Sequence, residues 1–266
     1  MKLRFIKFVF GAIGILALFS LAVAQSVGSD HLLTQLRSQD PQTRVRAADA
    51  LARKGVIENM SAALPFVVDA TRDEIKSVRH MALNMLWIEA SSSLEGAKLV
   101  AGAMPSIIER FRDRDRKIRS DAISVVSIIG EHNPSYAIAA VMPLIHDQDP
   151  HIRELAITAL GGLGAERPQI KALLLQRLKL DTAPEARGAA AQYLQHYNDV
   201  TVVSALIAAL ADPDPYVRAK AAYSLAFIGP KASEALPRLE AMAREPSRNM
   251  QLKEALHAAL KSIRGR

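Results

Sequence analysis

The chain has 266 residues, of which half are apolar but only 5% are aromatic, and it contains no cysteine. The lack of cysteine excludes disulfides and any zinc or iron–sulfur site built from thiolates. Alanine, leucine and isoleucine supply most of the apolar content, which favours closely packed helices over a sheet core. The formal net charge is +7, from 34 basic and 27 acidic residues.

The first 24 residues have the plan of a secretory signal peptide. A basic start is followed by an apolar run from Phe8 to Ala22 and by Ala22-Val23-Ala24, which fits the small-residue cleavage pattern. The run of about 16 apolar residues is short of the roughly 20 that a membrane-spanning helix needs, although a retained anchor stays the alternative. We therefore expect cleavage after Ala24, export to the periplasm or medium, no stable membrane span in the mature chain, and a short linker over residues 25–29.

Removal of this segment takes away three basic residues and no acidic one. The mature chain then carries 31 basic against 27 acidic residues. So small an excess is not the electrostatic footprint of a nucleic-acid-binding protein. We expect no nucleic-acid partner.

An arginine recurs at intervals of 31–40 residues through the rest of the chain. The repeated arginines are Arg44, Arg79, Arg119, Arg153, Arg187 and Arg218, and Lys253 takes the seventh place. Each lies near the start of a helical pattern, with alanine three positions later in six of the seven units and mostly leucine seven positions later. This periodicity predicts seven copies of a second helix, helix B, and a buried alanine where two helices approach closely. Glycine at four of the seven ends and asparagine at a fifth suggest left-handed C-terminal caps.

A looser helical pattern, helix A, precedes each helix B. The expected A helices cover Asp30–Ser38, Ile57–Ala70, Leu94–Arg112, Ser135–His146, Gln169–Leu180, Val200–Ala211 and Lys231–Arg244. An internal proline in four of them should kink or restart the helix: Pro65, Pro105, Pro143 and Pro237. Several joints between A and B carry Asp-Pro, which fits a helix N-cap followed by the first helical residue.

Paired helices of this length, Asp-Pro joints, a fixed arginine and an alanine/leucine face together resemble HEAT-repeat proteins, and most closely the short HEAT-like repeats of phycobilisome lyases. The resemblance covers about residues 30–264, within a predicted repeat domain of residues 30–266. It implies an all-α armadillo/HEAT-type fold, a right-handed α-solenoid of about seven helical hairpins. Such solenoids imply a protein-interaction scaffold. The alternative is an enzyme or enzyme accessory on the same fold, either lyase-like or a metal-dependent oxidoreductase of the deoxyhypusine hydroxylase type.

The sequence gives the enzymatic alternative little support. The His-Glu motifs that bind iron in the hydroxylase are absent. The chain also lacks the Gly-x-Ser-x-Gly motif of serine nucleophiles and the glycine-rich motifs that bind phosphate. His146 and His151, flanked by Asp147 and Asp149, are the best local metal candidate, but they lack a third ligand at a fixed spacing. We expect no catalytic residue, no metal and no cofactor.

The repeated arginines are a stronger candidate for a functional site than these histidines, because a series of cations could bind an anion. However, a cation in the first turn of a helix is disfavoured by the helix dipole, so we expect each arginine to be held by a carboxylate. The carboxylates predicted to serve lie in the A–B joints: Asp40, Asp113, Asp115, Asp149, Asp212 and Asp214.

One face of helix B remains as a binding surface, if this helix lines the concave side of the solenoid. Its small polar and aromatic side chains suit a protein or extended peptide partner. The predicted contact residues are His80, Asn84, Trp87, Lys117, His151, Thr158, Gln192, Tyr216 and Tyr223. An ordinary solvated helix face would have the same composition.

Overall fold

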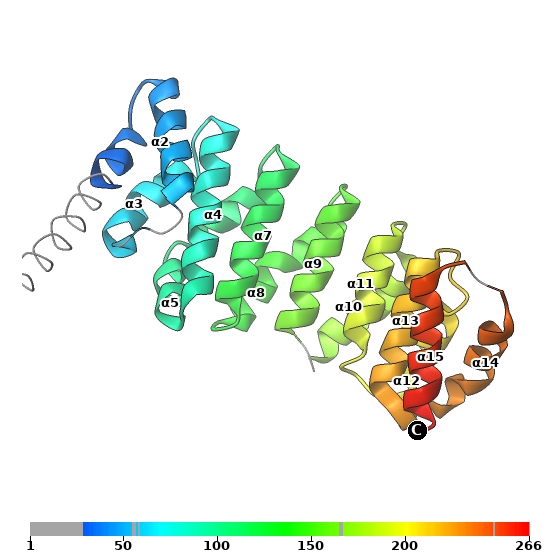
Figure 1. Cartoon of the computed structure of the whole chain (residues 1–266). Coiled ribbons are helices and arrows are strands. Elements are labelled where there is room, and N and C mark those ends of the chain that lie inside the picture. The colour runs from blue at the N-terminus through cyan, green and yellow to red at the C-terminus, as the bar shows by residue number, and fades with distance from the viewer. Residues whose placement is uncertain (1–28, 55–56, 58, 165–166, 247, 266) are drawn as a thin grey trace, which may run out of the picture. The chain divides into compact units, whose positions relative to one another are not determined.

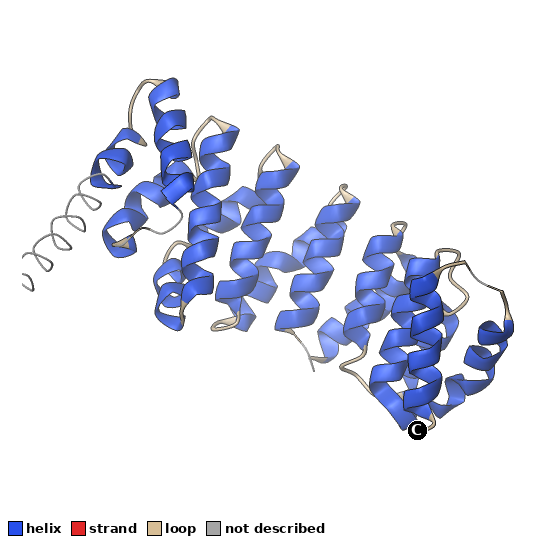
Figure 2. Ribbon diagram, in the orientation of Figure 1, coloured by secondary structure: helices blue, strands red, loops and turns tan. Residues whose placement is uncertain are grey.

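The computed structural model describes residues 29–54, 57, 59–164, 167–246 and 248–265. The proposed signal segment and most of the linker lie outside these ranges. The described residues form helices joined by turns, with no strand among them (Figure 2). They divide between Ile129 and Gly130 into two compact units.

The N-terminal unit contains the first three helical pairs. Residues 29–35 are helical and precede α2 (Pro41–Lys54), and α3 (Met60–Ala70) precedes α4 (Lys76–Ser92). In the third pair α5 (Leu94–Ala101), α6 (Met104–Glu109) and the short 3-10 helix η1 (Arg110–Arg112) precede α7 (Arg116–Gly130). The second helices α2 and α4 pack side by side (Figure 1).

The C-terminal unit contains four further pairs. These are α8 (Pro134–Val141) with η2 (Met142–His146) and α9 (Pro150–Leu163); α10 (Pro168–Leu180) and α11 (Pro184–Leu194); α12 (Val200–Ala209) and α13 (Pro215–Ile228); and η3 (Gly229–Ala235) with α14 (Leu236–Arg244) and α15 (Met250–Ile263). Here α9, α11, α13 and α15 pack in series (Figure 1). The seven predicted B helices are thus confirmed within the described residues.

The prolines restart the A helices as predicted in three of four places. Pro105 lies in the first turn of α6, Pro143 in the first turn of η2 and Pro237 in the first turn of α14. The helices expected over Leu94–Arg112 and Ser135–His146 are therefore broken rather than continuous. Pro65 differs, because it lies inside α3 without ending it.

The alanine positions are buried as predicted. The alanine three residues after each repeated arginine has no exposed surface in any of the six units: Ala47, Ala82, Ala122, Ala156, Ala190 and Ala221. In the seventh unit Leu256 takes this place at the last B helix and is also buried. Small side chains here let neighbouring helices approach closely, and the remaining apolar faces complete a dense core.

Two of the predicted left-handed glycine caps, Gly130 and Gly164, are wrong, and a third, Gly55, lies outside the described residues. Among the described glycines only Gly229 and Gly265 have a positive φ. Gly130 and Gly164 instead make room for neighbouring side chains: a Cβ on Gly130 would lie 2.5 Å from the Cβ of Ala137, and one on Gly164 would lie 2.5 Å from Cγ1 of Ile170. Glycine therefore recurs at these helix ends because the following A helix packs there.

Candidate functional site

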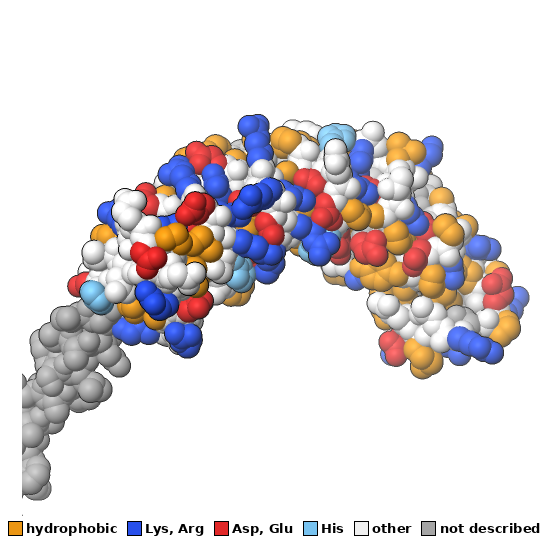
Figure 3. Space-filling view, turned by 90° about the horizontal axis from the view of Figure 1, so that it is seen from above, with side chains coloured by type: hydrophobic (Ala, Val, Ile, Leu, Met, Phe, Trp, Pro, Cys, Tyr) orange, Lys and Arg blue, Asp and Glu red, His pale blue; other side chains and the backbone are white. Residues whose placement is uncertain are grey.

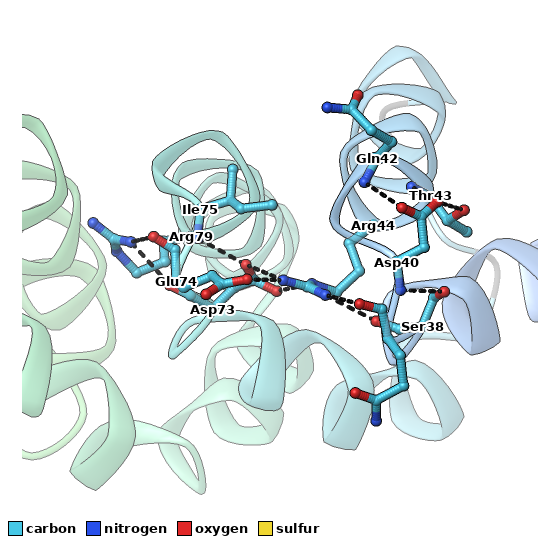
Figure 4. A network of polar contacts seen from close by, with 10 residues as sticks. Ser38, Asp40, Gln42, Thr43, Arg44, Asp73, Glu74, Ile75 and Arg79 are labelled. Atoms are coloured by element: carbon cyan, nitrogen blue, oxygen red, sulfur yellow. Dashed lines mark hydrogen bonds and ion pairs between the residues drawn. The ribbon is translucent and has the colours of Figure 1, made fainter.

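The repeated arginines lie at the joints between A and B helices, and the first of them shows how the guanidinium reaches in two directions. In Arg44, Nη1 donates to the carbonyl oxygens of Ser38 and Gln39 in its own joint, at 2.9 and 3.3 Å. Its Nε donates at 2.6 Å to the carboxylate of Asp73 in the joint of the next pair, and Nη2 donates at 2.8 Å to Glu74 (Figure 4). The arginine thus ties its own joint to the next one.

The same arrangement recurs in both units. Arg79 donates to Asp113 at 3.0 Å in the N-terminal unit. In the C-terminal unit Arg153 binds both oxygens of Asp181, at 3.0 and 2.8 Å, and the two bonds from Arg187 to Asp212 are both 2.8 Å. Planar two-point pairing of this kind is the strongest form of arginine–carboxylate contact. The side chain of Asp181 is 1% exposed and that of Arg153 is 12% exposed, so water competes little for the pair.

An aspartate also recurs in the joints as one column of an alignment of the repeats, here called the aspartate column, and four of its five members receive the bonds described above. The sequence interpretation missed it in part. Each member lies six residues before a repeated arginine: Asp73, Asp113, Asp147, Asp181 and Asp212. One carboxylate oxygen of each also accepts the backbone N–H two residues later, at 2.8–3.0 Å. The aspartate column therefore shapes its own turn, and in the pairs described above it also holds the preceding arginine. An alignment of the joints alone would have shown it.

The remaining predicted carboxylates have other tasks. Asp149 and Asp214 cap the N-termini of α9 and α13, accepting backbone N–H groups at 3.0 and 2.8 Å. Asp40 does the same for α2 at 2.9 Å, and Asp115 accepts from the backbone of Lys117 at 2.8 Å. Of the six predicted partners, Asp113 and Asp212 are therefore confirmed by these contacts. The other four accept backbone N–H groups at the starts of B helices, and Asp115 also pairs with Lys76 at 2.7 Å.

The ion pairs make the structure sensitive to acid. Burial opposes the ionisation of Asp181, but the hydrogen bond from Arg153, with further favourable contacts, outweighs it and lowers the pKa of Asp181. The same balance lowers the pKa of Asp212 beside Arg187. A carboxylate with a lowered pKa in the folded state contributes stability above its unfolded pKa of about 3.9, and this contribution is lost as the pH falls through the folded-state value.

Two positions of the series depart from the pattern. Arg119 is not one of them, since it donates to the carbonyl oxygens of Asp113 and Arg114 in its own joint as the other arginines do. Arg218 makes the corresponding bonds to Asp212 and Pro213, at 2.7 and 3.0 Å, but no carboxylate among the described residues pairs with it. Lys253 is exposed. The aspartate column has serine, Ser247, at the position that would follow Arg218, and this residue lies outside the described ranges.

In the N-terminal unit the structure brings two predicted contact residues together. His80 on α4 and Lys117 on α7 both contact the carboxylate of Asp121, each at 2.6 Å. Asn84 and Trp87 follow His80 along α4 and are exposed, with Trp87 at 42%. Asp121 was not predicted, and its position one turn after Lys117 is the signal that could have found it.

In the C-terminal unit the predicted residues lie on three neighbouring B helices. His151 is exposed and faces Glu154 at 3.3 Å on α9, where Thr158 is half-buried. Gln192 on α11 accepts a hydrogen bond from Lys220 on α13 at 2.7 Å, and the Lys220 ammonium also lies 5.4 Å from the ring centroid of Tyr216. Tyr223 is half-buried on the same helix.

Two tyrosines of this unit are packing residues. The ring of Tyr216 lies against Gly188, where an added Cβ would come within 2.3 Å of Cε1. Tyr193 covers Gly161 in the same way, with Cγ at 2.3 Å from the added Cβ. Burial raises the pKa of both phenols. Tyr216 thus has a structural role between α11 and α13 that the sequence did not reveal.

The surface charge is mixed. In Figure 3 basic and acidic side chains are interspersed on the visible face of each unit, and neither sign forms a broad patch there. The described residues contain no group of three or more histidines, aspartates or glutamates that could hold a metal ion, so His146, His151, Asp147 and Asp149 do not come together as one. No described helix is both long enough and apolar enough to cross a bilayer.

A profile of HEAT repeats matches residues 104–191 and 171–261, which is more than half of the chain. The chain belongs to the HEAT-repeat family. This bears out the fold expected from the repeated helical pairs, an armadillo/HEAT-type α-solenoid. The phycobilisome-lyase-type subgroup remains a prediction. No curated protein sequence gives a significant match.

Solved structures show the same repeat fold. An engineered protein determined by a structural genomics consortium is similar over 89% of this HEAT-repeat chain and 68% of its own, with 18% identity and a TM-score of 0.59. A designed armadillo repeat protein, solved in complex with the peptide (KR)4, is similar over 88% of this chain and 98% of its own, with 18% identity and a TM-score of 0.51. At this identity the likeness concerns the fold alone.

Proposed function

We propose that this HEAT-repeat protein is an exported interaction scaffold that binds an extended polypeptide along its B helices. The observation that carries the proposal is an aromatic edge in the C-terminal unit, formed by His196, Tyr223 and Phe227. Phe227 is 65% exposed, and its ring makes an edge contact with the imidazole of His196, with centroids 5.8 Å apart. Tyr223 lies one turn before Phe227 on α13 and therefore on the same face.

Polar groups accompany this aromatic edge. Lys220 lies one turn before the Tyr223–Phe227 pair, and its bond to Gln192 links α13 to α11. Rigid aromatic rings next to amides and charges suit an extended chain, which offers backbone groups and occasional side chains. The designed armadillo repeat protein that shares the fold was solved with a peptide, which supports a polypeptide as the ligand class. Each repeat would add a contact of modest strength, so that affinity builds up along the array.

The peptide-binding proposal can be tested by selecting displayed random peptides against the full chain. We expect enriched peptides whose binding weakens at least about tenfold, or 1.4 kcal/mol, when Tyr223 and Phe227 are both changed to serine. Leu180→Ser is the matched control, because Leu180 is 61% exposed but lies on the A helix α10. Fluorescence anisotropy gives the affinities, and circular dichroism checks folding.

Two results would contradict the peptide proposal. One is that no peptide is enriched. The other is that the selected peptides bind the Tyr223/Phe227 variant as tightly as they bind the Leu180 variant. Tyr216 is left unchanged in this design, since its ring supports the packing against Gly188.

Export is a separate part of the proposal and rests on residues 1–24, which lie outside the described ranges. The basic start, the apolar run and Ala22-Val23-Ala24 support it. Mass spectrometry of the protein from its native cells should find a mature chain that begins at Gln25. A chain that keeps Met1 and fractionates with membranes would contradict cleavage and favour a retained anchor.

A further inference from the structure

The C-terminal unit contains a cavity beside Arg218, the repeated arginine of this unit that pairs with no carboxylate among the described residues. The cavity has a volume of about 310 Å³ and lies between the joint that follows α12 and the helices α13, α14 and α15. Its polar lining includes Arg218, Arg238, Asp212 and Glu245, and its apolar lining includes Leu210, Met242, Leu252 and Leu256. None of these residues belongs to the aromatic edge, so a role for the cavity is independent of the proposed function.

The guanidinium of Arg218 is oriented by its own joint in the same way as those of Arg153 and Arg187, which bind carboxylates. Its Nη1 is fixed by two carbonyl oxygens of its own joint, as in Arg153 and Arg187. In those two arginines, Nε and Nη2 donate to the aspartate of the next joint. At Arg218 no described residue accepts from Nε or Nη2, and the guanidinium lines the cavity instead. The position is therefore a preoriented two-point donor without an acceptor in the described part of the chain.

The charges around the cavity favour an anion. Asp212 is already engaged by both donors of Arg187 and so adds little free negative charge. Arg238 lines the same cavity and has no ion-pair partner among the described residues, which gives a second cation near Arg218. Glu245 is exposed and opposes them with a single charge. Two guanidinium groups at one small cavity bind carboxylate more readily than either alone.

We infer that this cavity is a carboxylate-binding site, in which a carboxylate from outside the chain takes the place that Asp181 takes beside Arg153. The apolar walls provided by Leu210, Met242, Leu252 and Leu256 fit a short aliphatic stem behind the carboxylate. The ligand class is accordingly an aliphatic carboxylate, either the side chain of an acidic residue in a polypeptide or a free small acid.

The inference can be tested by observing the arginine Nε–Hε signals of the full chain by NMR. The probes are propionate, N-acetyl-aspartate N-methylamide and, as the neutral control, N-acetyl-asparagine N-methylamide. We expect a saturable shift of the Arg218 signal, assigned from its loss in Arg218→Lys, and no comparable shift of the Arg153 signal. Arg238→Gln should weaken the binding of the carboxylate probe several-fold, while Arg244→Gln, which removes an exposed arginine at the end of the same helix, should not.

The probes also distinguish the source of the carboxylate. A response to both carboxylates indicates that a free acid suffices, and a response to the aspartate derivative alone indicates an acidic peptide segment; either supports the site. The inference is overturned if the Arg218 signal does not respond saturably. It is equally overturned if the asparagine derivative shifts that signal as much, or if Arg153 and Arg218 respond alike.

Discussion

Replacing Arg153 by glutamine should lower the free energy of unfolding by about 3 kcal/mol, because the buried carboxylate of Asp181 loses both hydrogen bonds from Arg153 and is left with the more distant Arg177, whose Nη1 lies 3.8 Å away. The same change at Arg218 should cost only about 1 kcal/mol. Both arginines donate Nη1 to two carbonyl oxygens of their own joint, so both variants lose those bonds. The two arginines differ in their ion pairs: Arg153 pairs with Asp181, whereas no described carboxylate pairs with Arg218.

Urea unfolding followed by circular dichroism measures this difference. Arg218→Gln is the matched control, since it changes the same residue type at the same repeat position. Equal destabilisation by the two substitutions would show that the carbonyl bonds, rather than the arginine–aspartate pair, carry the stabilising effect. The repeated arginines would then be anchors of their own joints only.

Two adjacent glycines of α9 should respond in opposite ways to alanine. Gly161→Ala should destabilise the protein by about 2 kcal/mol, because the new Cβ would lie 2.3 Å from Cγ and 2.6 Å from Cβ of Tyr193. These atoms are at the base of the side chain and cannot swing away. Gly162→Ala should stabilise the protein by up to about 1 kcal/mol, since nothing lies within 4 Å of its added Cβ and alanine is the better helix former.

Thermal and urea unfolding of the two variants give the comparison. A further variant, Tyr193→Gly, identifies the cause: in that background the cost of Gly161→Ala should largely disappear, because both the Cβ and the ring atoms that the new side chain meets are gone. If Gly161→Ala and Gly162→Ala shift stability in the same direction, Tyr193 does not define the spacing between α9 and α11 as the structure indicates.

The sequence predicted the repeat well, because the features that define each repeat depend on interactions between residues close in the sequence. The arginine spacing located all seven B helices, and the burial of Ala156 and Ala190 follows from a helical period that a single sequence displays. Asp149 and Asp214 cap their helices for reasons that lie within four residues. Pro105 and Pro237 restart helices because the ring removes a backbone donor, which is again a local effect.

The relations between repeats were harder to predict. The partner of Arg153 is Asp181, in the next joint, and the two are linked only when consecutive units are stacked. The sequence predicts Tyr216 as a surface contact residue, and only the structure shows that its ring packs against Gly188. The distinct position of Arg218 depends on serine replacing aspartate in the last joint, which gains meaning only once the other pairs are known. The helical period shows which side chains share one face of a helix, but it does not show which neighbouring helix that face contacts.

The most direct test of the arginine–aspartate connection is a double-mutant cycle between Arg153 and Asp181, measured at neutral and at acidic pH. Arg153→Gln, Asp181→Asn and the double variant separate the pair from the bonds that each side chain makes elsewhere. We predict a coupling free energy of about 2 kcal/mol near pH 7, which fades as the pH falls well below about 3.9 and Asp181 takes up a proton. A coupling near zero at pH 7, or one that does not change with pH, would contradict the claim that the repeated arginines join neighbouring repeats through buried ion pairs.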